Sequence, residues 1–287
     1  MLDKKNLPIF GLVLIVIVAA AYLKFTPRKT NTSTPTPLPS EASAKLGSPT
    51  PSPTPKPLTF AQMNSLYGPC VFLPTLMYHH IQDAKAAADK KQTALTVDTD
   101  FFRQQMQYLK DKGYVSATAN DLINFFNNGT KIPAKSILIT IDDGYDDFYL
   151  NALPILREMG FTATVFVPTG LVNNPGYLSW DQIESAAGQG IFFANHTWSH
   201  KNVQVAQDVM VREITTADTQ LSEKGLNNPK VFAYPYGFSS VTAEKLLTQL
   251  GYQLAFTTNP GSILCKAKHF DLPRVRIGNG SMSRYGF

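Results

Sequence analysis

Four side chains of this chain have the types and the spacing needed for metal-assisted chemistry. The segment SILITIDDGYDD places Asp142 and Asp143 directly after an apolar run, Ile137–Ile141. The segment NHTWSH places His196 and His200 four residues apart, again after an apolar run. Residues at i and i+4 of a helical turn face the same side, so both imidazoles can reach one ion. Two histidines and one carboxylate, with a position left open for water, are typical of catalytic zinc and related divalent centres.

The second acidic pair in this stretch, Asp146 and Asp147, has a simpler interpretation. A helix is expected over residues 147–159, and carboxylates stabilise the N-terminus of a helix by accepting from its free N–H groups. Capping does not explain Asp142 and Asp143, because both precede the glycine turn that separates the strand from the helix. We therefore expect two reactive carboxylates followed by two capping ones.

Short apolar runs alternate with amphipathic segments from about residue 66 onward, which predicts a largely parallel sheet. Strands are expected at Val71–Met77, Ser136–Ile141, Ala163–Val167, Ile191–Ala194, Val231–Tyr234, Gln253–Thr257 and Arg274–Ile277. Helices are expected at 99–112, 119–127, 147–159, 180–189, 207–224 and 241–250. About seven repeats favour an α/β fold, a closed or distorted (β/α) barrel, with an open doubly wound sheet as the alternative. Either fold gathers functional side chains at the carboxyl ends of its strands.

The distribution of charge argues against nucleic acid as a partner. The formal net charge is +5, but residues 1–60 hold seven Lys/Arg and two Asp/Glu, and residues 61–287 hold nineteen of each. The excess positive charge therefore belongs to the leading segment and not to the globular part. The absence of a glycine-rich phosphate loop from the sequence also weakens nucleotide-binding interpretations. The sequence indicates no protein partner.

The N-terminal residues have the composition of a membrane signal. Lys4 and Lys5 precede an apolar stretch from about Leu7 to Leu23, which is near the lower length limit for a spanning helix. One interpretation is an uncleaved anchor over residues 1–26, with the lysines on the cytoplasmic side. The other is a cleavable signal peptide that ends at small residues. The anchor is favoured, because the apolar run continues past the alanines; in either case the rest of the chain is exported, as a single-pass membrane protein or in secreted form.

Between this segment and the globular domain, residues 27–60 are rich in Pro, Ser and Thr. Such a composition cannot bury a core, and it predicts an extended, disordered spacer. The globular domain is expected to span residues 66–287. Cys70 and Cys265 lie near its two ends, and a cysteine pair in an exported protein is more often bonded than free. A disulfide is therefore predicted, with two separate buried thiols as the alternative.

Three motifs together resemble those of the polysaccharide deacetylases, the NodB-homology group of carbohydrate esterase family 4. TIDDGYDD is similar to the T-F-D-D-G motif of this family, and HTWSH matches its H-[S/T]-x-x-H motif. FAYPYG, residues 232–237, resembles the third motif, which contains Pro-Tyr-Gly. The resemblance covers about residues 70–280, with the three motifs in the family's order. It implies a distorted (β/α) barrel that hydrolyses acetyl groups on a polysaccharide.

The resemblance also implies roles for the residues of the first two motifs. A divalent metal would be bound by Asp143, His196 and His200. Zn²⁺ is the expected ion, with Co²⁺ or Ni²⁺ as alternatives. Asp142 would act as the general base on metal-bound water, because a free carboxylate can take the proton of a water that the cation has acidified.

The third motif and one tryptophan are expected to line the substrate site. By resemblance, the backbone N–H of Tyr236 would stabilise the oxyanion, with Tyr234 and Pro235 beside it. Trp180, in the segment YLSWDQI, precedes an expected helix. Its ring is expected either to stack on a sugar or to pack in the core.

The sequence departs from the family pattern at the residue that orients the base. The third motif usually begins with an arginine, and the chain has Ala233 there. Arg274 or Arg276, in the segment LPRVRI, is expected to supply the guanidinium from another strand, and Arg274 is preferred. The alternative is a structural or surface role for both arginines.

The general acid is a second departure. The late motif that usually provides a histidine is unclear, since His269 lies in a charged loop. Some members, similar to the poly-N-acetylglucosamine deacetylases of biofilms, are circularly rearranged, carry this histidine early in a MYH strand end and share the YPYG form. In PTLMYHHI, His79 ends the first expected strand, so in a closed barrel it can reach the site. His79 is therefore the expected acid, with His80 as an alternative.

The sequence as a whole predicts an exported, metal-dependent hydrolase that removes N-acetyl groups from N-acetylglucosamine units of a cell-surface polysaccharide. An O-acetyl esterase on xylan or wall glycan is an alternative, because both reactions pass through the same oxyanion. A non-catalytic glycan-binding protein on the same scaffold is another, which the missing arginine favours and the intact Asp142 opposes. A paired-carboxylate glycosidase is disfavoured, since adjacent residues rarely give the separation that its mechanism needs.

Overall fold

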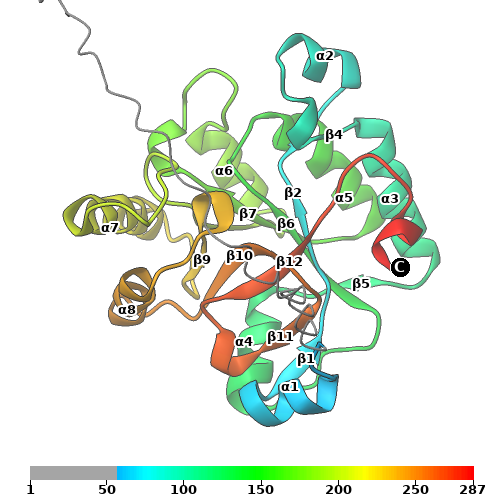
Figure 1. Cartoon of the computed structure of the whole chain (residues 1–287). Coiled ribbons are helices and arrows are strands. Elements are labelled where there is room, and N and C mark those ends of the chain that lie inside the picture. Colours follow the sequence, from blue (N-terminus) through cyan, green and yellow to red (C-terminus); the bar gives the residue numbers. More distant parts are fainter. Residues whose placement is uncertain (1–56) are drawn as a thin grey trace, which may run out of the picture. The chain divides into compact units, whose positions relative to one another are not determined.

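Apolar runs rich in Ile, Val and Phe form the buried strands of a closed parallel barrel (Figure 1). The computed structural model describes residues 57–287. Its ring of seven strands is, in spatial order, β2 (Thr75–Tyr78), β12 (Leu272–Arg276), β10 (Leu254–Pro260), β9 (Val231–Ala233), β8 (Phe192–Asn195), β7 (Thr164–Val167) and β6 (Ser136–Ile141). β2 pairs in parallel with both β12 and β6, and this double pairing closes the ring. The barrel expected from the sequence is confirmed.

Within residues 57–287, five short strands lie outside the ring. They are β1 (Cys70–Phe72), β3 (His80–Ile81), β4 (Thr96–Val97), β5 (Val115–Ser116) and β11 (Ile263–Cys265). β5 extends the sheet along β6, and β3 pairs with β4. The single strand expected at Val71–Met77 is wrong. The chain leaves β1 at Leu73-Pro74, and a proline has no N–H with which to continue a ladder.

The β1–β11 pair carries the two cysteines of the chain. The strands are antiparallel, and Cys70 lies directly opposite Cys265 in their register. The two residues form a disulfide with an S–S distance of 2.05 Å, so the pairing expected from the sequence is present. This bond joins the first strand of the described region to the approach of the last barrel strand.

Helices surround the barrel and connect its strands (Figure 1). They are α1 (Phe60–Tyr67), α2 (Ala84–Asp89), α3 (Thr99–Asp111), α4 (Ala119–Asn128), α5 (Leu153–Met159), α6 (Trp180–Ala187), α7 (Gln207–Glu223) and α8 (Val241–Gln249). The six expected helices correspond to α3–α8, except that the turn before α5 is π-helical (η2, Phe148–Ala152). α1 begins at Phe60, the last residue of the expected spacer, and a capping box formed by Thr59 and Gln62 stabilises its start. Regular structure thus begins before residue 66.

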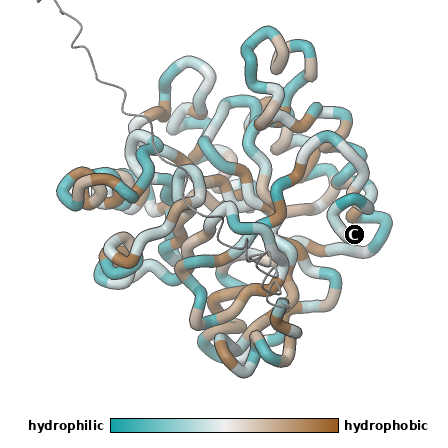
Figure 2. Tube along the Cα trace, viewed as in Figure 1, coloured by the Kyte–Doolittle hydropathy of each residue, from teal (hydrophilic) through white to brown (hydrophobic). Residues whose placement is uncertain are grey.

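Two layers of apolar side chains follow from the alternation of residues along each strand. In β9, Val231 and Ala233 belong to the cluster that fills the barrel, together with Phe166 and Leu138. Phe232 instead belongs to an outer cluster with side chains of α7 and α8. Figure 2 shows the hydrophobic colour concentrated in the strands. The barrel interior is therefore a packed core, and the site lies where the strands end.

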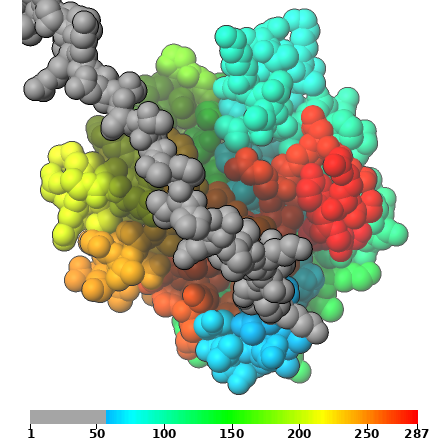
Figure 3. Space-filling view, viewed as in Figure 1, coloured from blue at the N-terminus to red at the C-terminus, as the bar shows by residue number. Residues whose placement is uncertain are grey.

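The C-terminal residues help to hold the end of β2. Gln105 of α3 accepts a hydrogen bond from the hydroxyl of Tyr78 at 3.0 Å and donates to the carbonyls of Gly278 and Gly280. The carbonyl of Phe287 accepts from Tyr108 of the same helix. Figure 3 shows the C-terminal segment against the surface beside α3. This network fixes the side chain of Tyr78, the last residue of β2, which His79 follows.

Among residues 57–287, no helix is long and apolar enough to cross a membrane. The anchor expected at residues 1–26 lies outside the described residues. So does the spacer expected at residues 27–60, except for its last four residues, which lead into α1.

Candidate active site

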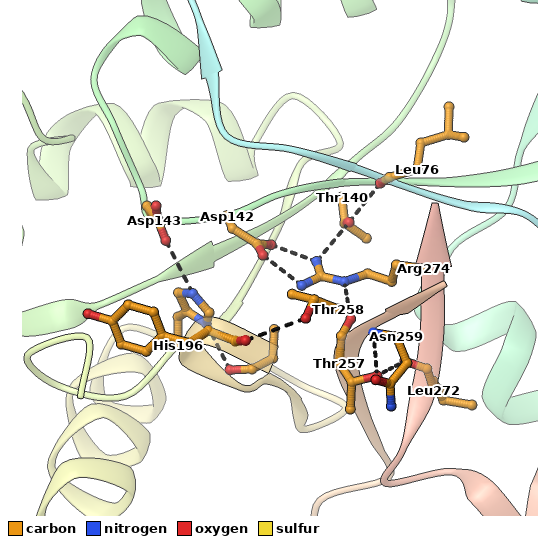
Figure 4. A network of polar contacts seen from close by, with 12 residues as sticks. Leu76, Thr140, Asp142, Asp143, His196, Thr257, Thr258, Asn259, Leu272 and Arg274 are labelled. Atoms are coloured by element: carbon orange, nitrogen blue, oxygen red, sulfur yellow. Dashed lines mark hydrogen bonds and ion pairs between the residues drawn. The ribbon is translucent and has the colours of Figure 1, made fainter. Parts of the chain in front are cut away.

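The chemically competent residues follow the carboxyl ends of barrel strands, as expected for a parallel barrel. Asp142 and Asp143 come directly after β6, and His196 comes directly after β8. His79 follows β2, and Arg274 projects from β12. Figure 4 shows that the two neighbouring aspartates turn to different partners, Asp142 to Arg274 and Asp143 to His196.

Arg274 holds Asp142 through a bidentate ion pair. Its Nη1 donates to Oδ1 of Asp142 at 2.7 Å, and its Nη2 donates to Oδ2 at 2.6 Å. Both side chains are buried, with 2% of Asp142 and 1% of Arg274 exposed. The guanidinium therefore comes from β12, where the sequence placed it, while Ala233 occupies the usual position. Arg276 is exposed.

Two further N–H groups of Arg274 also have hydrogen-bond partners, which helps a full positive charge to be buried. Nε donates to the carbonyl of Thr257 at 2.9 Å, and Nη1 also donates to the hydroxyl of Thr140 at 3.1 Å. Thr140 in turn donates to the carbonyl of Leu76 at 2.7 Å. The guanidinium lies 5.7 Å from the ring centre of Phe166. Three strands thus fix the arginine in one position.

This pairing determines the charge of Asp142. Burial alone would raise the pKa of its carboxyl group, but the charge and the hydrogen bonds of Arg274 outweigh burial, so the pKa lies below its ordinary value. Asp142 is therefore a carboxylate at neutral pH. Each oxygen has lone pairs beyond the one that accepts from Arg274, so the carboxylate can still take a proton.

Asp143, His196 and His200 converge on one point. Oδ1 of Asp143 lies 3.3 Å from Nε2 of His196 and 3.0 Å from Nε2 of His200. One ligand atom from each of the three side chains lies within 4.8 Å of the other two. Asp143 has a φ of 74°, in the left-handed region, and this turn directs its carboxylate away from Asp142.

The donor set fits a divalent transition metal. Nδ1 of His196 lies 2.8 Å from the carbonyl of Ala233. Nδ1 donates its proton there, so Nε2 faces Asp143, and loss of the proton on Nε2 would free a lone pair for a metal. A hydrogen bond of this kind to the far ring nitrogen is typical of metal-ligating histidines. Two imidazole nitrogens and one carboxylate oxygen suit Zn²⁺ and similar ions.

Charge at this triad also favours a cation. Burial would raise the pKa of the Asp143 carboxyl group, but hydrogen bonds with the two histidines hold it well below its ordinary value. Burial lowers the pKa of His200, and its hydrogen bond and charge interaction with Asp143 more than reverse this effect. The carboxylate of Asp143 thus favours positive charge beside it, on an imidazole or on a bound ion.

His79 directly follows the pairing of Tyr78 with Ile141, so it comes level with Asp142 along the two neighbouring strands. Burial lowers the pKa of its imidazole, whereas the charges of Asp142 and Asp143 oppose this shift. This place after β2 is the one expected from the sequence, and the role of His79 as general acid stays a prediction. His269 lies before β12, at the opposite end of that strand from the site, where its Nδ1 contacts the carbonyl of Lys266.

Tyr236 forms part of the rim of the site. Its ring packs edge-on against His200, with 4.9 Å between ring centres, and 60% of the residue is exposed. Its φ is 62°, so the backbone turns sharply within the short helix η4 (Pro235–Gly237). Gly237 is required in this turn, because a Cβ there would lie 2.0 Å from Oγ1 of Thr258. Pro235 is buried beneath the turn.

The structure does not bring the side chains of Tyr234 and Trp180 to the site. Strand alternation directs Tyr234 outward, on the same side as Phe232, into the cluster under α7 and α8. The ring centres of Tyr234 and Phe232 are 5.1 Å apart. Trp180 packs against the outer core, and Nζ of Lys224 lies 4.9 Å from its ring centre. Tyr234 therefore does not line the substrate site with its side chain as expected, and Trp180 takes the alternative that the sequence left open, packing against the core.

Asp147 does not cap the helix that follows it. The turn that starts there has no side-chain cap, and the carboxylate of Asp147 instead contacts Nδ1 of His80 at 2.5 Å and accepts from the N–H of Ile81. The His80 ring stacks on Tyr145, with 3.6 Å between ring centres. Asp143 is one cause of the raised pKa of Tyr145, after burial, so this tyrosine lies near the metal triad. The capping expectation for Asp147 is therefore wrong. His80 is held between the carboxylate of Asp147 and the ring of Tyr145.

Comparison with known proteins agrees with this site. The profile of the family described as polysaccharide deacetylase matches residues 129–255. YxkH of Bacillus subtilis (strain 168), a protein named as a polysaccharide deacetylase, is 30% identical over 220 residues, which cover 75% of each chain. The poly-beta-1,6-N-acetyl-D-glucosamine N-deacetylase of Escherichia coli (strain K12) is 27% identical over 71% of this chain, which spans 36% of that protein's length.

A solved structure extends the comparison to three dimensions. The Streptococcus pyogenes deacetylase PplD, in complex with acetate, superposes with a TM-score of 0.69 and 32% sequence identity. The match covers 75% of this chain and 96% of PplD. The fold of the barrel is thus shared along most of the described region, and the chain belongs to the polysaccharide deacetylase family.

Proposed function

We propose that the protein removes N-acetyl groups from N-acetylglucosamine units of an extracellular polysaccharide and that it requires a divalent metal. One observation carries this proposal. Asp142 is kept ionised by Arg274, while the adjacent Asp143 turns to His196 and His200. A base and a three-ligand metal set thus lie side by side, which is an arrangement suited to metal-assisted hydrolysis of an amide by water.

The metal would be held by Asp143, His196 and His200. Once bound, a divalent cation there polarises the acetyl carbonyl group and acidifies water, which lowers the barrier to attack. Zn²⁺ is the ion that the two imidazoles and one carboxylate favour most directly. Co²⁺ and Ni²⁺ accept the same donor set, so the choice among them is left to measurement.

The side chains then divide the proton transfers. Asp142 takes a proton from the attacking water as its oxygen bonds to the carbonyl carbon. The backbone N–H of Tyr236 is proposed to donate to the oxyanion that forms. The carbon–nitrogen bond breaks as His79 gives a proton to the leaving amine. Acetic acid and a free glucosamine amine are released, and the acid loses its proton to solvent to give acetate. The proton held by Asp142 passes to His79, directly or through solvent, which restores both side chains.

The substrate class is supported by the relatives and by the shape of the rim. Several curated relatives are named as poly-beta-1,6-N-acetyl-D-glucosamine N-deacetylases, at 21–27% identity. The exposed ring of Tyr236 next to His200 offers a face on which a sugar can stack. We also propose that residues 1–26 tether the enzyme to the cell membrane, with the barrel outside the cell.

The test is acetate release by the purified full-length protein from β-1,6-linked N-acetylglucosamine oligomers, chitin oligomers, peptidoglycan and acetylated xylan. We expect release from at least one glucosamine polymer, loss of activity on chelation and recovery when Zn²⁺ or Co²⁺ is added. Asp142→Asn should lower activity by about 10²–10⁴-fold, whereas Asp146→Asn, a matched change in the same turn, should keep activity. Release from xylan alone would make the enzyme an O-acetyl esterase. No release from any substrate by the metal-loaded protein would refute the proposal.

The acid is tested separately with two histidine variants. His79→Ala should lower turnover by about 10²–10⁴-fold, and His269→Ala should leave it unchanged, since His269 lies at the other end of β12. Full activity of His79→Ala together with loss of activity in His269→Ala would reverse this assignment.

A further inference from the structure

The segment between the two histidines of the metal triad has an unfavourable backbone. Thr197 and His200 have φ values of 66° and 61°, in the left-handed region that residues other than glycine rarely adopt. Such conformations persist only where surrounding contacts hold them. The position of His200 therefore depends on something outside the segment.

One side of this segment is held by backbone bonds. The N–H of Thr169 donates to the carbonyl of Thr197 at 3.2 Å, and the N–H of Gly170 donates to the carbonyl of Trp198 at 2.7 Å. A Cβ at Gly170 would lie 2.5 Å from Nε1 of Trp198, so the two segments are in close contact. These contacts lie on the β7 side and leave Ser199 and His200 to be fixed from elsewhere.

Glu213 of α7 holds the other side. Its Oε2 accepts from the N–H of Ser199 at 2.7 Å, and its Oε1 accepts from the hydroxyl of Ser199 at 2.6 Å. Only 2% of Glu213 is exposed, although it is an acid in the buried face of a helix. The exposed Lys201 lies 3.8 Å from Oε1 and contributes little to the pairing. The carboxylate is thus committed to the residue directly before His200.

Asn195 holds the start of the same segment. Its Oδ1 accepts from the N–H of Thr197 at 2.7 Å, and its Nδ2 donates to the carbonyl of Ile214 at 3.2 Å. Ile214 is the neighbour of Glu213, so one turn of α7 contacts the segment at both ends. If the Glu213 contact were lost, Asn195 would still hold Thr197. Ser199 would lose both of the side-chain hydrogen bonds that hold it.

We propose that Glu213 is a positioning residue for the metal centre, which holds His200 in its ligating conformation through Ser199. The inference rests on the proposed metal site, and it adds a role that the three motifs do not contain. Its consequence is a specific one. Removal of the carboxylate should weaken metal binding more than it weakens the fold, because the strained segment relaxes while α7 remains packed.

The experiment measures the Kd of Zn²⁺ for the metal-free full-length protein, by competition with a chelating dye, alongside its melting temperature. Glu213→Ala should raise the Kd by about 10–100-fold, the usual effect of losing a residue that orients a ligand. The absorption spectrum of the Co²⁺-loaded variant should also change, since that spectrum reports ligand geometry. Glu213→Gln can keep both contacts if the hydroxyl of Ser199 reverses, so its Kd should rise less.

Leu221→Ala is the matched control. Leu221 is fully buried on the same helix, so the change destabilises α7. It should lower the melting temperature and leave the Kd of Zn²⁺ and the Co²⁺ spectrum unchanged. If Glu213→Ala does not fold, Ser199→Ala, which removes one of the two hydrogen bonds, should still raise the Kd relative to Leu221→Ala.

The outcomes separate this inference from the proposed function. Wild-type protein that binds neither Zn²⁺ nor Co²⁺ would refute the metal centre itself. Wild-type protein that binds metal, with Glu213→Ala or Ser199→Ala indistinguishable from it in Kd and spectrum, would refute only the role of Glu213. A Kd that rises equally in Leu221→Ala would reduce Glu213 to a general contribution to stability.

Discussion

The two halves of the site neutralise adjacent carboxylates in different ways. On the base side, which comprises Asp142, Arg274, Thr140 and Thr257, the cation is a permanent part of the chain. On the metal side, which comprises Asp143, His196 and His200, the partners are imidazoles, which need not carry a charge. Asp142 and Asp143 are similarly buried, with 2% and 6% exposed, so burial does not explain the difference.

The difference shows how one dipeptide can supply two functions. A carboxylate with both oxygens paired to a fixed guanidinium stays ionised and is a poor ligand for a second cation. A carboxylate that faces two imidazoles offers a site that a removable cation completes. The left-handed turn at Asp143 separates the two directions. Without it, two adjacent buried carboxylates would compete for the same partner and one would tend to become protonated.

Metal removal should have the largest effect on acetate release. It should act only through Asp143, His196 and His200, which form the metal side. Chelation, or His196→Ala, should reduce acetate release to the background level, and added Zn²⁺ or Co²⁺ should restore the chelated enzyme only. Metal at about 100 times its Kd should also stabilise the fold by about 2.7 kcal/mol. Activity assays and thermal melts with and without chelator measure both effects. Full activity in the chelated protein would remove the functional distinction between the two sides.

Asp142→Asn should have the next largest effect. It removes the base and keeps the shape of the side chain, so turnover should fall by about 10²–10⁴-fold. The Kd of Zn²⁺ should change little, because Asp142 is not among the proposed ligands. Metal titration and kinetics on one preparation separate the two quantities. A variant that loses metal and activity together would show that Asp142 belongs to the metal side.

Much of this division could be predicted from the sequence, because it depends on local patterns. Apolar runs that end in Asp142 or His196 identify strand ends, and a parallel barrel collects its strand ends at one face. Arg274 could be proposed because a barrel that closes on itself brings its last strand next to its first. The outward direction of Tyr234 could also have been derived, since alternation along β9 places it on the same side as Phe232.

Other features depend on contacts that no local pattern encodes. Asp147 meets His80, 67 residues earlier in the chain, only because β3 lies beside the turn that precedes α5. Glu213 did leave a signal, since it lies among Met210, Ile214 and Ala217 on the apolar face of an amphipathic helix. An acid in such a place must have a buried partner, although the sequence does not say which one.

Arg274→Met tests the ion pair of the base side by removing the partner of Asp142. Removal of one member of a buried ion pair leaves the other uncompensated, so the free energy of unfolding should fall by about 3–5 kcal/mol. Turnover should fall as well, because an unpaired buried Asp142 tends to be protonated. Denaturant unfolding measures the stability, and Arg276→Met, at the exposed end of the same strand, is the matched control for stability.

The double variant Asp142→Asn/Arg274→Met completes this test. Because the uncompensated charge is then absent, most of the stability lost in Arg274→Met should return, while activity stays low. Additive losses of stability in the double variant would mean that Asp142 and Arg274 do not act as a pair.

Thr140→Val should have the smallest effect and shows how far the base side extends. The hydroxyl of Thr140 accepts from Arg274 and donates to the carbonyl of Leu76, so its loss should cost about 1–3 kcal/mol of stability. The two hydrogen bonds between Arg274 and Asp142 remain, so turnover should fall less than about tenfold, and the Kd of Zn²⁺ should not change. Thr164→Val, on the neighbouring strand β7, is the control of equal size. A loss of turnover as large as that of Asp142→Asn would mean that the position of the guanidinium, and not only its charge, controls the base.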